Sequence, residues 1–406
     1  MDPIRDQPAH AHHRVAKWVK AHPGRAVFFA ALGVRLTALI AIQTLLPDSW
    51  LALDDATYMG LAADLASGET ADWSPDLRQL FESTATFLIP LAALFWVFGP
   101  SQMLGSILVV LVGAGAAGLT TKVAARALPP EWALAAGGVV AFLPSQIGWS
   151  VTTLKDAWVW FVAAGVAYAM AAAVGSNPTR RVWPWVAVAI WLILLSHLRL
   201  HSTVVAVWAV ALTVLVTIRP LRWGPVGITL VIALIIPWAA GGGPGGFDTV
   251  AQRVTDLEQV RAANAVGADS AFVDVPPATV SPDVDGANPG ADVVHLPRGL
   301  SVMLLEPYPW EENRSSQIVF AKLDTILWYP VLGLALVGLM ALRHHRQIVV
   351  FPLLYGGGVT LMYALAEGNL GTAFRHRGEA VWAAAILAAV GARELWARRL
   401  DRGAGS

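Results

Sequence analysis

Two adjacent carboxylates, Asp54 and Asp55, stand shortly after the first long apolar segment of the chain. One of them could act as a general base on an acceptor hydroxyl near the membrane surface. The pair could instead bind a divalent cation through its oxygens. The residues at 56–67 have helical spacing and predict an interfacial amphipathic helix, whose N-terminus Asp55 could simply cap.

A second pair, Lys155 and Asp156, opens an apolar segment at 154–175. Lys155 could contact an anionic group, and Asp156 could add a further acid near the first pair. The alternative is a neutral pair that only anchors the end of a helix.

His197, Arg199 and His201 interrupt an apolar stretch. Ionisable groups at membrane depth are expensive and usually face a cavity or a partner. Their spacing fits a turn or a broken helix end better than a continuous helix. His197 and His201 could supply two ligands to zinc, but the sequence shows no third ligand.

The last cluster, in the segment EGNLGTAFRHRGEA, contains Glu367, Asn369, Arg375, His376 and Arg377. Arg binds phosphate in a bidentate manner, and the N-terminus of a following helix adds N–H donors. The two arginines therefore predict a phosphate clamp in an outer turn. Snorkelling of long side chains to the interface is the alternative.

These residues lie in a chain whose composition is typical of an integral membrane protein. Of its 406 residues, 56% are hydrophobic and 14% charged, well below the charged fraction of soluble domains. The formal net charge of zero gives no reason to expect a nucleic-acid partner. The absence of Cys excludes disulfides and thiolate catalysis. Arg35, inside the first apolar segment, is expected to pair with an acid or to face the interior of the bundle.

Apolar length and the positive-inside rule predict an all-α polytopic protein of about ten transmembrane helices. Both termini are placed in the cytoplasm and the membrane is taken to be the plasma membrane. The apolar stretch 26–46, which follows a basic N-terminal segment, is too long for a typical signal-peptide core and is expected to be a retained first helix. The expected spans are 26–47, 102–126, 131–149, 154–175, 183–198, 202–218, 224–240, 324–342, 348–366 and 379–396.

The remaining segments complete the expected domain organisation. A cytoplasmic N-terminus at 1–25 precedes a transmembrane core at 26–240, with an outer loop at 48–100. The short apolar stretch 84–98 is expected to lie at the outer interface or to re-enter the membrane. An acidic extracytoplasmic loop at 241–323, with a short helix near 249–265, precedes C-terminal transmembrane helices at 324–397 and a cytoplasmic tail at 398–406.

Asp54-Asp55 followed by Tyr58 and LAADLASG resembles the first outer loop of the polytopic GT-C glycosyltransferases. FGPSQMLGSILVVL, the Pro-Ser turn before Lys155-Asp156 and FRHRGEAVWAAAIL extend the resemblance over roughly 26–200 and 350–396. It implies a GT-C-like fold with a catalytic acid at Asp54 or Asp55 and carrier-phosphate contacts at Arg375 and Arg377. The Lys-Pro-Pro type motif of aminoarabinose-transferase relatives is absent.

The resemblance implies a membrane enzyme that moves a sugar from a polyprenyl-phosphate donor to a cell-envelope acceptor at the outer face. Its partners would be that donor and membrane lipids, with no cofactor beyond the divalent cation that Asp54 and Asp55 could bind. A transporter or flippase, or a polymerase for lipid-linked saccharides, would use similar groups. The chain shows no convincing internal repeat, which favours an enzyme over a transporter.

Overall fold

The computed structural model describes residues 7–45, 55–175, 182–217, 261, 289–312 and 316–404. These residues are mostly helical. The α-helices are α1 (Gln7–Ala21), α2 (Pro23–Leu45), α3 (Asp55–Ser67), α4 (Pro75–Glu82), α5 (Ala85–Phe98), α6 (Gln102–Ala124), α7 (Pro130–Phe142), α8 (Pro144–Gly148), α9 (Asp156–Gly175), α10 (Trp183–Ser196), α11 (Leu200–Thr217), α15 (Pro289–Leu305), α16 (Ser316–Met340), α17 (Arg346–Ala366) and α18 (Leu370–Ala404).

Seven of the described helices are long and apolar enough to cross a bilayer: α2, α6, α9, α11, α16, α17 and α18. The chain is therefore a helical membrane protein, as its composition predicts. Helix α10 is apolar but has 14 residues, short of the length of a full span. The span expected at 224–240 and the helix expected near 249–265 fall outside the described residues, apart from Arg261.

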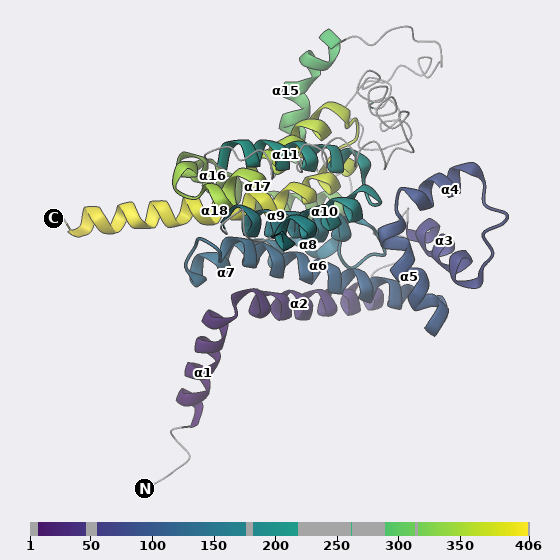
Figure 1. Ribbon diagram of the computed structural model, residues 1–406, viewed down its shortest axis with the longest axis horizontal. Helices are drawn as coiled ribbons and strands as arrows, with labels where there is room; N and C mark the ends of the chain where they lie inside the picture. Colours follow the sequence, from purple (N-terminus) through teal and green to yellow (C-terminus); the bar gives the residue numbers. More distant parts are fainter. Residues whose placement is uncertain are drawn as a thin grey trace.

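The long helices run side by side in Figure 1. Their contacts define two ends of the bundle. At the first end the start of α2 meets the end of α6, where Gly24 approaches Lys122, and His345 before α17 contacts Arg393 of α18. We call this the basic end. The opposite end, where α9, α11 and α18 begin, is called the rim end.

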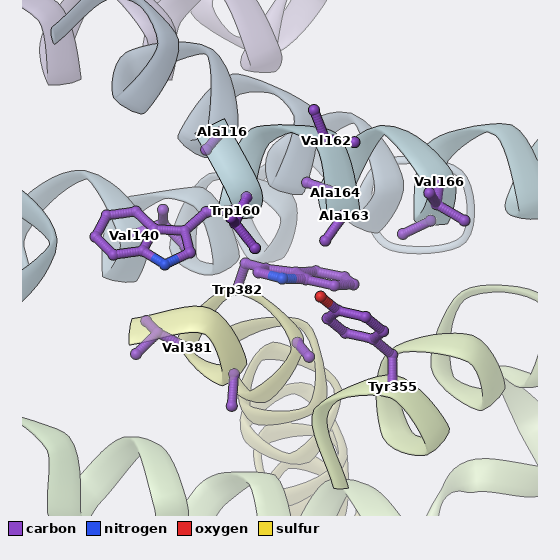
Figure 2. Close-up of a cluster of buried hydrophobic side chains, with 14 of the residues drawn as sticks. Ala116, Val140, Trp160, Val162, Ala163, Ala164, Val166, Tyr355, Val381 and Trp382 are labelled. Atoms are coloured by element: carbon purple, nitrogen blue, oxygen red, sulfur yellow. The ribbon is translucent and has the colours of Figure 1, made fainter. Parts of the chain in front are cut away.

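The core lies where α9 passes α18. Helix α9 is rich in alanine and valine, and Trp160 fills the space beside it (Figure 2). Trp382 of α18 packs against Tyr355 of α17 with ring centroids 5.6 Å apart. A Cβ at Gly378 would lie 2.7 Å from the Trp160 ring, so the missing side chain lets α18 approach α9 closely. This contact fixes the residues on either side of Gly378 relative to α9.

The predicted outer loop forms α3, α4 and α5. The helix expected at 56–67 is confirmed, with observed bounds Asp55–Ser67. Helices α4 and α5 bend by 98° at their junction, which fits the expectation that 84–98 re-enters the membrane or lies at its surface. The rings of Tyr58, Phe87 and Trp158 form a chain of aromatic contacts from α3 through α5 to α9. The loop helices are thereby attached to the rim end.

The prediction of a single span at 131–149 was wrong. Helix α7 ends at Phe142, and a short helix and irregular backbone follow before α9. A proline disfavours helical backbone at the residue before it, and Pro144 lies just after the end of α7 at this break. Irregular backbone at membrane depth is tolerated only where its polar groups find partners inside the protein.

Arg35 of α2 supplies those partners. Its guanidinium is fully buried and donates to the carbonyls of Val140 and Ala141 at 2.9 and 3.0 Å, and to the carbonyl of Gln146 at 3.3 Å. The expectation that Arg35 faces the bundle interior is confirmed. Its partners among the described residues are these carbonyls of α7 and α8, the Ala31 carbonyl of its own helix at 3.4 Å and the Ser150 hydroxyl at 2.8 Å, and no acid is among them.

Two predicted helix boundaries were also wrong. The last helix begins at Leu370, nine residues before the predicted start, so the segment expected to be an outer turn is helical. Helix α16 begins at Ser316 and takes in the end of the segment assigned to the outer loop. Each extension contains a charged residue that bonds inside the protein, Arg377 in α18 and Lys322 in α16, and such residues make a hydropathy window stop short of the true helix ends.

Substitution of Gly338 by alanine is expected to separate α16 from α18. A Cβ at Gly338 would lie 2.1 Å from the carbonyl oxygen of Leu387, and backbone cannot yield as a side chain can. Overpacking of this kind costs about 1–3 kcal/mol, so the melting temperature in detergent should fall by several degrees. Gly333→Ala on the same helix is the control, because in the described part of the chain a Cβ there would meet no atom within 4 Å apart from its own helix backbone. Equal melting temperatures for the two variants would contradict the close packing.

Candidate functional site

Three of the predicted site residues meet in one buried ionic cluster at the rim end. Arg199, which directly precedes α11, donates to Asp156 Oδ1 at 2.9 Å. The other oxygen of Asp156 accepts from Arg375 Nε at 2.8 Å. Asp156 is the first residue of α9, where a carboxylate also interacts favourably with the positive end of the helix dipole. The cluster therefore joins α9, α11 and α18.

Glu379 completes the cluster and was not among the predicted site residues. Its Oε2 accepts from Arg199 at 3.0 Å and from the Tyr363 hydroxyl at 2.8 Å, and its Oε1 from Tyr355 at 2.5 Å. Glu379 was taken as the first residue of a span. An acid in an apolar segment costs free energy at membrane depth unless it has a partner. This signal could have identified Glu379 as a site residue.

The cluster balances its charge. Arg199 and Arg375 carry two positive charges, and Asp156 and Glu379 carry two negative ones. The side chains of Asp156, Glu379 and Arg199 are 1%, 0% and 5% exposed, whereas Arg375 is 17% exposed. Arg375 is thus the group of this cluster that reaches toward the surface.

A second polar pair lies beside the cluster. His376 Nδ1 and Glu367 Oε1 are 2.5 Å apart, and the imidazole stacks on the Tyr363 ring at 4.4 Å between centroids. The hydroxyl of Tyr363 also contacts His201 Nε2 at 3.2 Å. Glu367 and His376 therefore connect to the ionic cluster through one tyrosine, and His201 reaches the same tyrosine from α11.

Arg377 turns away from Arg375. Two residues along a helix are separated by about 200°, so the helical backbone of α18 sends their side chains to different sides. Arg377 donates to Asp324 Oδ2 at 3.2 Å, to the Thr325 hydroxyl at 3.1 Å and to the carbonyl of Glu306 at 3.0 Å. It is 3% exposed. Arg375 and Arg377 thus do not form the shared clamp that an outer turn would have allowed.

Glu306, beside Arg377, lies outside the seven candidate spans. Its carboxylate pairs with Arg298 and accepts from Ser301. Burial raises the pKa of Glu306 above the usual range, against the lowering effect of Arg298. This acid holds α15 against the turn that follows it. Its carbonyl, not its carboxylate, contacts Arg377.

Asn369 has a structural contact at the start of α18. Its side-chain oxygen accepts from the backbone N–H of Gly371 at 2.8 Å. Such a contact satisfies one of the N–H groups that a helix leaves free at its first turn.

The loop residues lie over the same end of the bundle. Asp55 Oδ2 accepts from Gln102 Nε2 at 2.7 Å, which ties the start of α3 to the start of α6. Lys155 Nζ lies 6.0 Å from the centroid of the Tyr58 ring. Asp55, Tyr58 and Lys155 are therefore placed together, next to Asp156. Asp54 falls outside the described residues.

His197 lies apart from His201. Its Nδ1 is 3.0 Å from the Ile193 carbonyl, and its side chain is exposed at the end of α10. The break between α10 and α11 is the broken helix end that the spacing predicted. Within the described part of the chain, no three His, Asp, Glu or Cys residues are grouped as metal ligands. The Asp55 carboxylate accepts an amide donor there, so the described residues show only part of the donor set that a divalent cation would need.

An apolar groove of about 500 Å³ opens between α5, α9 and α10. Trp158, Phe161 and Trp191 form its wall, and His197 stands at its polar edge. Trp158 follows Asp156 by two residues on α9, so the groove and the ionic cluster lie on opposite sides of that helix.

The chain matches no known family description, and no curated protein matches its sequence. What can be said of its chemistry therefore rests on the residues and contacts described above.

Proposed function

We propose that this protein is a membrane glycosyltransferase with a GT-C-like arrangement, which moves a sugar from a polyprenyl-phosphate donor to a cell-envelope acceptor. The observation that carries the proposal is that Arg375 bonds to Asp156, whose chain neighbour Lys155 lies 6.0 Å from the Tyr58 ring of the helix that begins at Asp55. A phosphate-binding group and a candidate base thus share the rim end.

The orientation follows from charge. Basic residues near span ends favour the cytoplasm, and the basic end carries Arg25, Lys122, Arg346 and Arg398. The rim end then faces outward, and both termini lie in the cytoplasm of a cell whose plasma membrane holds the protein. A lipid-linked sugar presented at the outer face would meet the rim end directly.

The carrier phosphate would bind Arg375, the more exposed guanidinium of the cluster, with Lys155 as a second cation. Arg375 takes over this role alone from the predicted pair, because Arg377 is buried against Asp324. In the transfer, the acceptor oxygen forms a bond to the anomeric carbon as the bond from that carbon to the phosphate oxygen breaks. The electron pair stays on the phosphate, where fixed cations stabilise the developing charge.

The proton of the acceptor hydroxyl would pass to Asp54 or Asp55. The prenyl chain would lie in lipid, and the groove between α5, α9 and α10 offers it an apolar surface. His197, at the end of α10, lines the groove, so the phosphate of a lipid lying there would pass around the first turn of α9 to reach Arg375.

Purified protein in liposomes, given radiolabelled polyprenyl-phosphate sugars and an envelope extract as acceptor, should form a labelled product. We expect Asp54→Asn or Asp55→Asn to abolish that product while the melting temperature stays unchanged, because asparagine loses the basic carboxylate and, at position 55, keeps an oxygen that can accept from Gln102. Glu69→Gln, an exposed acid of the same loop, is the control. Full transfer by both aspartate variants would rule out this mechanism. Movement of the labelled lipid across the membrane without transfer would indicate a transporter.

A further inference from the structure

The first helix of the chain, α1, has two unlike faces. Arg14, Lys17 and Lys20 recur every three residues along one side, and Val15, Trp18 and Val19 lie on another. A helix with a basic face, a face carrying Trp and aliphatic residues and low overall hydrophobicity is typical of segments that lie in the membrane interface. The charge and the apolar face are both features of α1 itself.

The position of α1 agrees with that pattern. In Figure 1 the long helices run along the bundle axis, and α1 runs across it, joined to α2 through His22. Because α2 crosses the bilayer, a helix that runs across the axis at its start lies close to the membrane plane. α1 also joins the bundle at the basic end, where Lys122 and Arg126 are found.

The apolar side of α1 is largely uncovered by the protein. Val15 is 60% exposed and Trp18 is 41% exposed. Exposing this apolar surface to water is unfavourable. At the boundary between headgroups and acyl chains, Val15 and Trp18 can contact the acyl chains while the lysines contact the headgroups. Trp is enriched at this boundary for the same reason.

The charges indicate which lipid would be preferred. The basic residues of α1 continue into Arg25, Lys122 and Arg126, and Arg343 and Arg346 lie at the same end. They outnumber the acids described there, which are Glu131, Glu394 and Asp401. A surface with this excess of positive charge is complementary to anionic headgroups, and each Lys or Arg near such a surface strengthens binding about fivefold.

We propose that α1 is an interfacial helix that binds anionic phospholipid at the basic end of the protein. Val15, Trp18 and Val19 enter the acyl-chain boundary, and Arg14, Lys17 and Lys20 contact lipid phosphates. This interaction does not depend on the chemistry at the rim end, since it uses the opposite end of the bundle.

The chain contains no Cys, so single cysteines can be introduced and spin-labelled one at a time. The full-length protein would carry Val15→Cys or Lys17→Cys in nanodiscs of phosphatidylcholine with or without phosphatidylglycerol. With phosphatidylglycerol we expect the label at position 15 to be accessible to oxygen and shielded from a water-soluble nickel chelate. The label at position 17 should show the reverse.

Charge reversal provides the second arm. Lys17→Glu with Lys20→Glu in the Val15→Cys background should weaken insertion of the position-15 label by at least about 25-fold, from fivefold per lysine. Glu69→Lys, at the other end of the protein, is the control and should change nothing. Equal insertion in discs with and without phosphatidylglycerol would overturn the preference for anionic lipid. Equal nickel accessibility at positions 15 and 17 would overturn the interfacial placement itself.

Discussion

Replacing Arg199 by methionine is expected to destabilise the protein strongly. Arg199 is 5% exposed and is bound to Asp156 and Glu379, both of which are almost fully buried. Methionine has a similar length but no charge, so it leaves Glu379 without a cation and Asp156 with Arg375 alone. Removing one partner of a buried ion pair typically costs about 3–5 kcal/mol.

The measurement is the melting temperature of purified protein in detergent, followed by the yield of monodisperse protein. Arg78→Met on α4 is the control, because the Arg78 guanidinium donates to the loop carbonyls of Trp73 and Ala71 and pairs with no acid among the described residues. A second variant tests the cause. Adding Glu379→Gln to Arg199→Met removes the unpaired charge and should recover part of the lost stability. If Arg199→Met melts with the wild type, the cluster does not hold α9, α11 and α18 together.

The residues of the cluster show how far a sequence can predict such a site. Asp156, Arg199 and Arg375 stand out individually, because each is an ionisable residue beside or inside an apolar run, where lipid makes charge expensive. The alternation of basic span ends also placed them at one end of the bundle, and their contacts agree with that placement. The high cost of charge in lipid thus allows the sequence to predict both that a site exists and at which end of the bundle it lies.

The sequence could not predict in the same way which of these charged residues pair with one another. Arg199 lies 43 residues from Asp156 and 180 from Glu379, and no local pattern records which acid folds against which arginine. Tyr355 and Tyr363 resemble ordinary aromatic residues of a span until Glu379 is placed beside them. The direction of the Arg375 and Arg377 side chains depended on whether the backbone was a turn or a helix, and the turn was assumed wrongly.

Arg35 is a further case, because its partners have no side-chain signature at all. It binds the carbonyls that α7 leaves free where the helix stops. Every residue has a carbonyl, so only the position of the break reveals which ones need a donor. Pro144 marks the break in retrospect, but prolines are tolerated within other helices of this chain, such as α16 and α17.

The second large effect is expected at Arg375. Arg375→Gln should reduce sugar transfer by about 100-fold to 1,000-fold, the range observed when one group that stabilises developing negative charge is removed. The protein should remain folded, because Asp156 keeps its bond to Arg199 and Arg375 is already partly exposed. Rate and melting temperature are therefore measured on the same preparation. Glutamine can still form hydrogen bonds, so a lower rate of sugar transfer would measure the contribution of the positive charge at position 375.

Arg377→Gln is the matched comparison, two residues along the same helix. Arg377 is buried against Asp324, Thr325 and the Glu306 carbonyl, so its loss should lower the melting temperature and affect transfer only through the fraction of folded protein. The two variants thus separate the arginine that we propose binds phosphate from one that holds α18 to α16. If Arg375→Gln transfers sugar at the wild-type rate, the carrier phosphate binds elsewhere. If Arg377→Gln instead lost transfer without losing stability, Arg377 would be the phosphate-binding residue, and α18 would have to rotate to expose it.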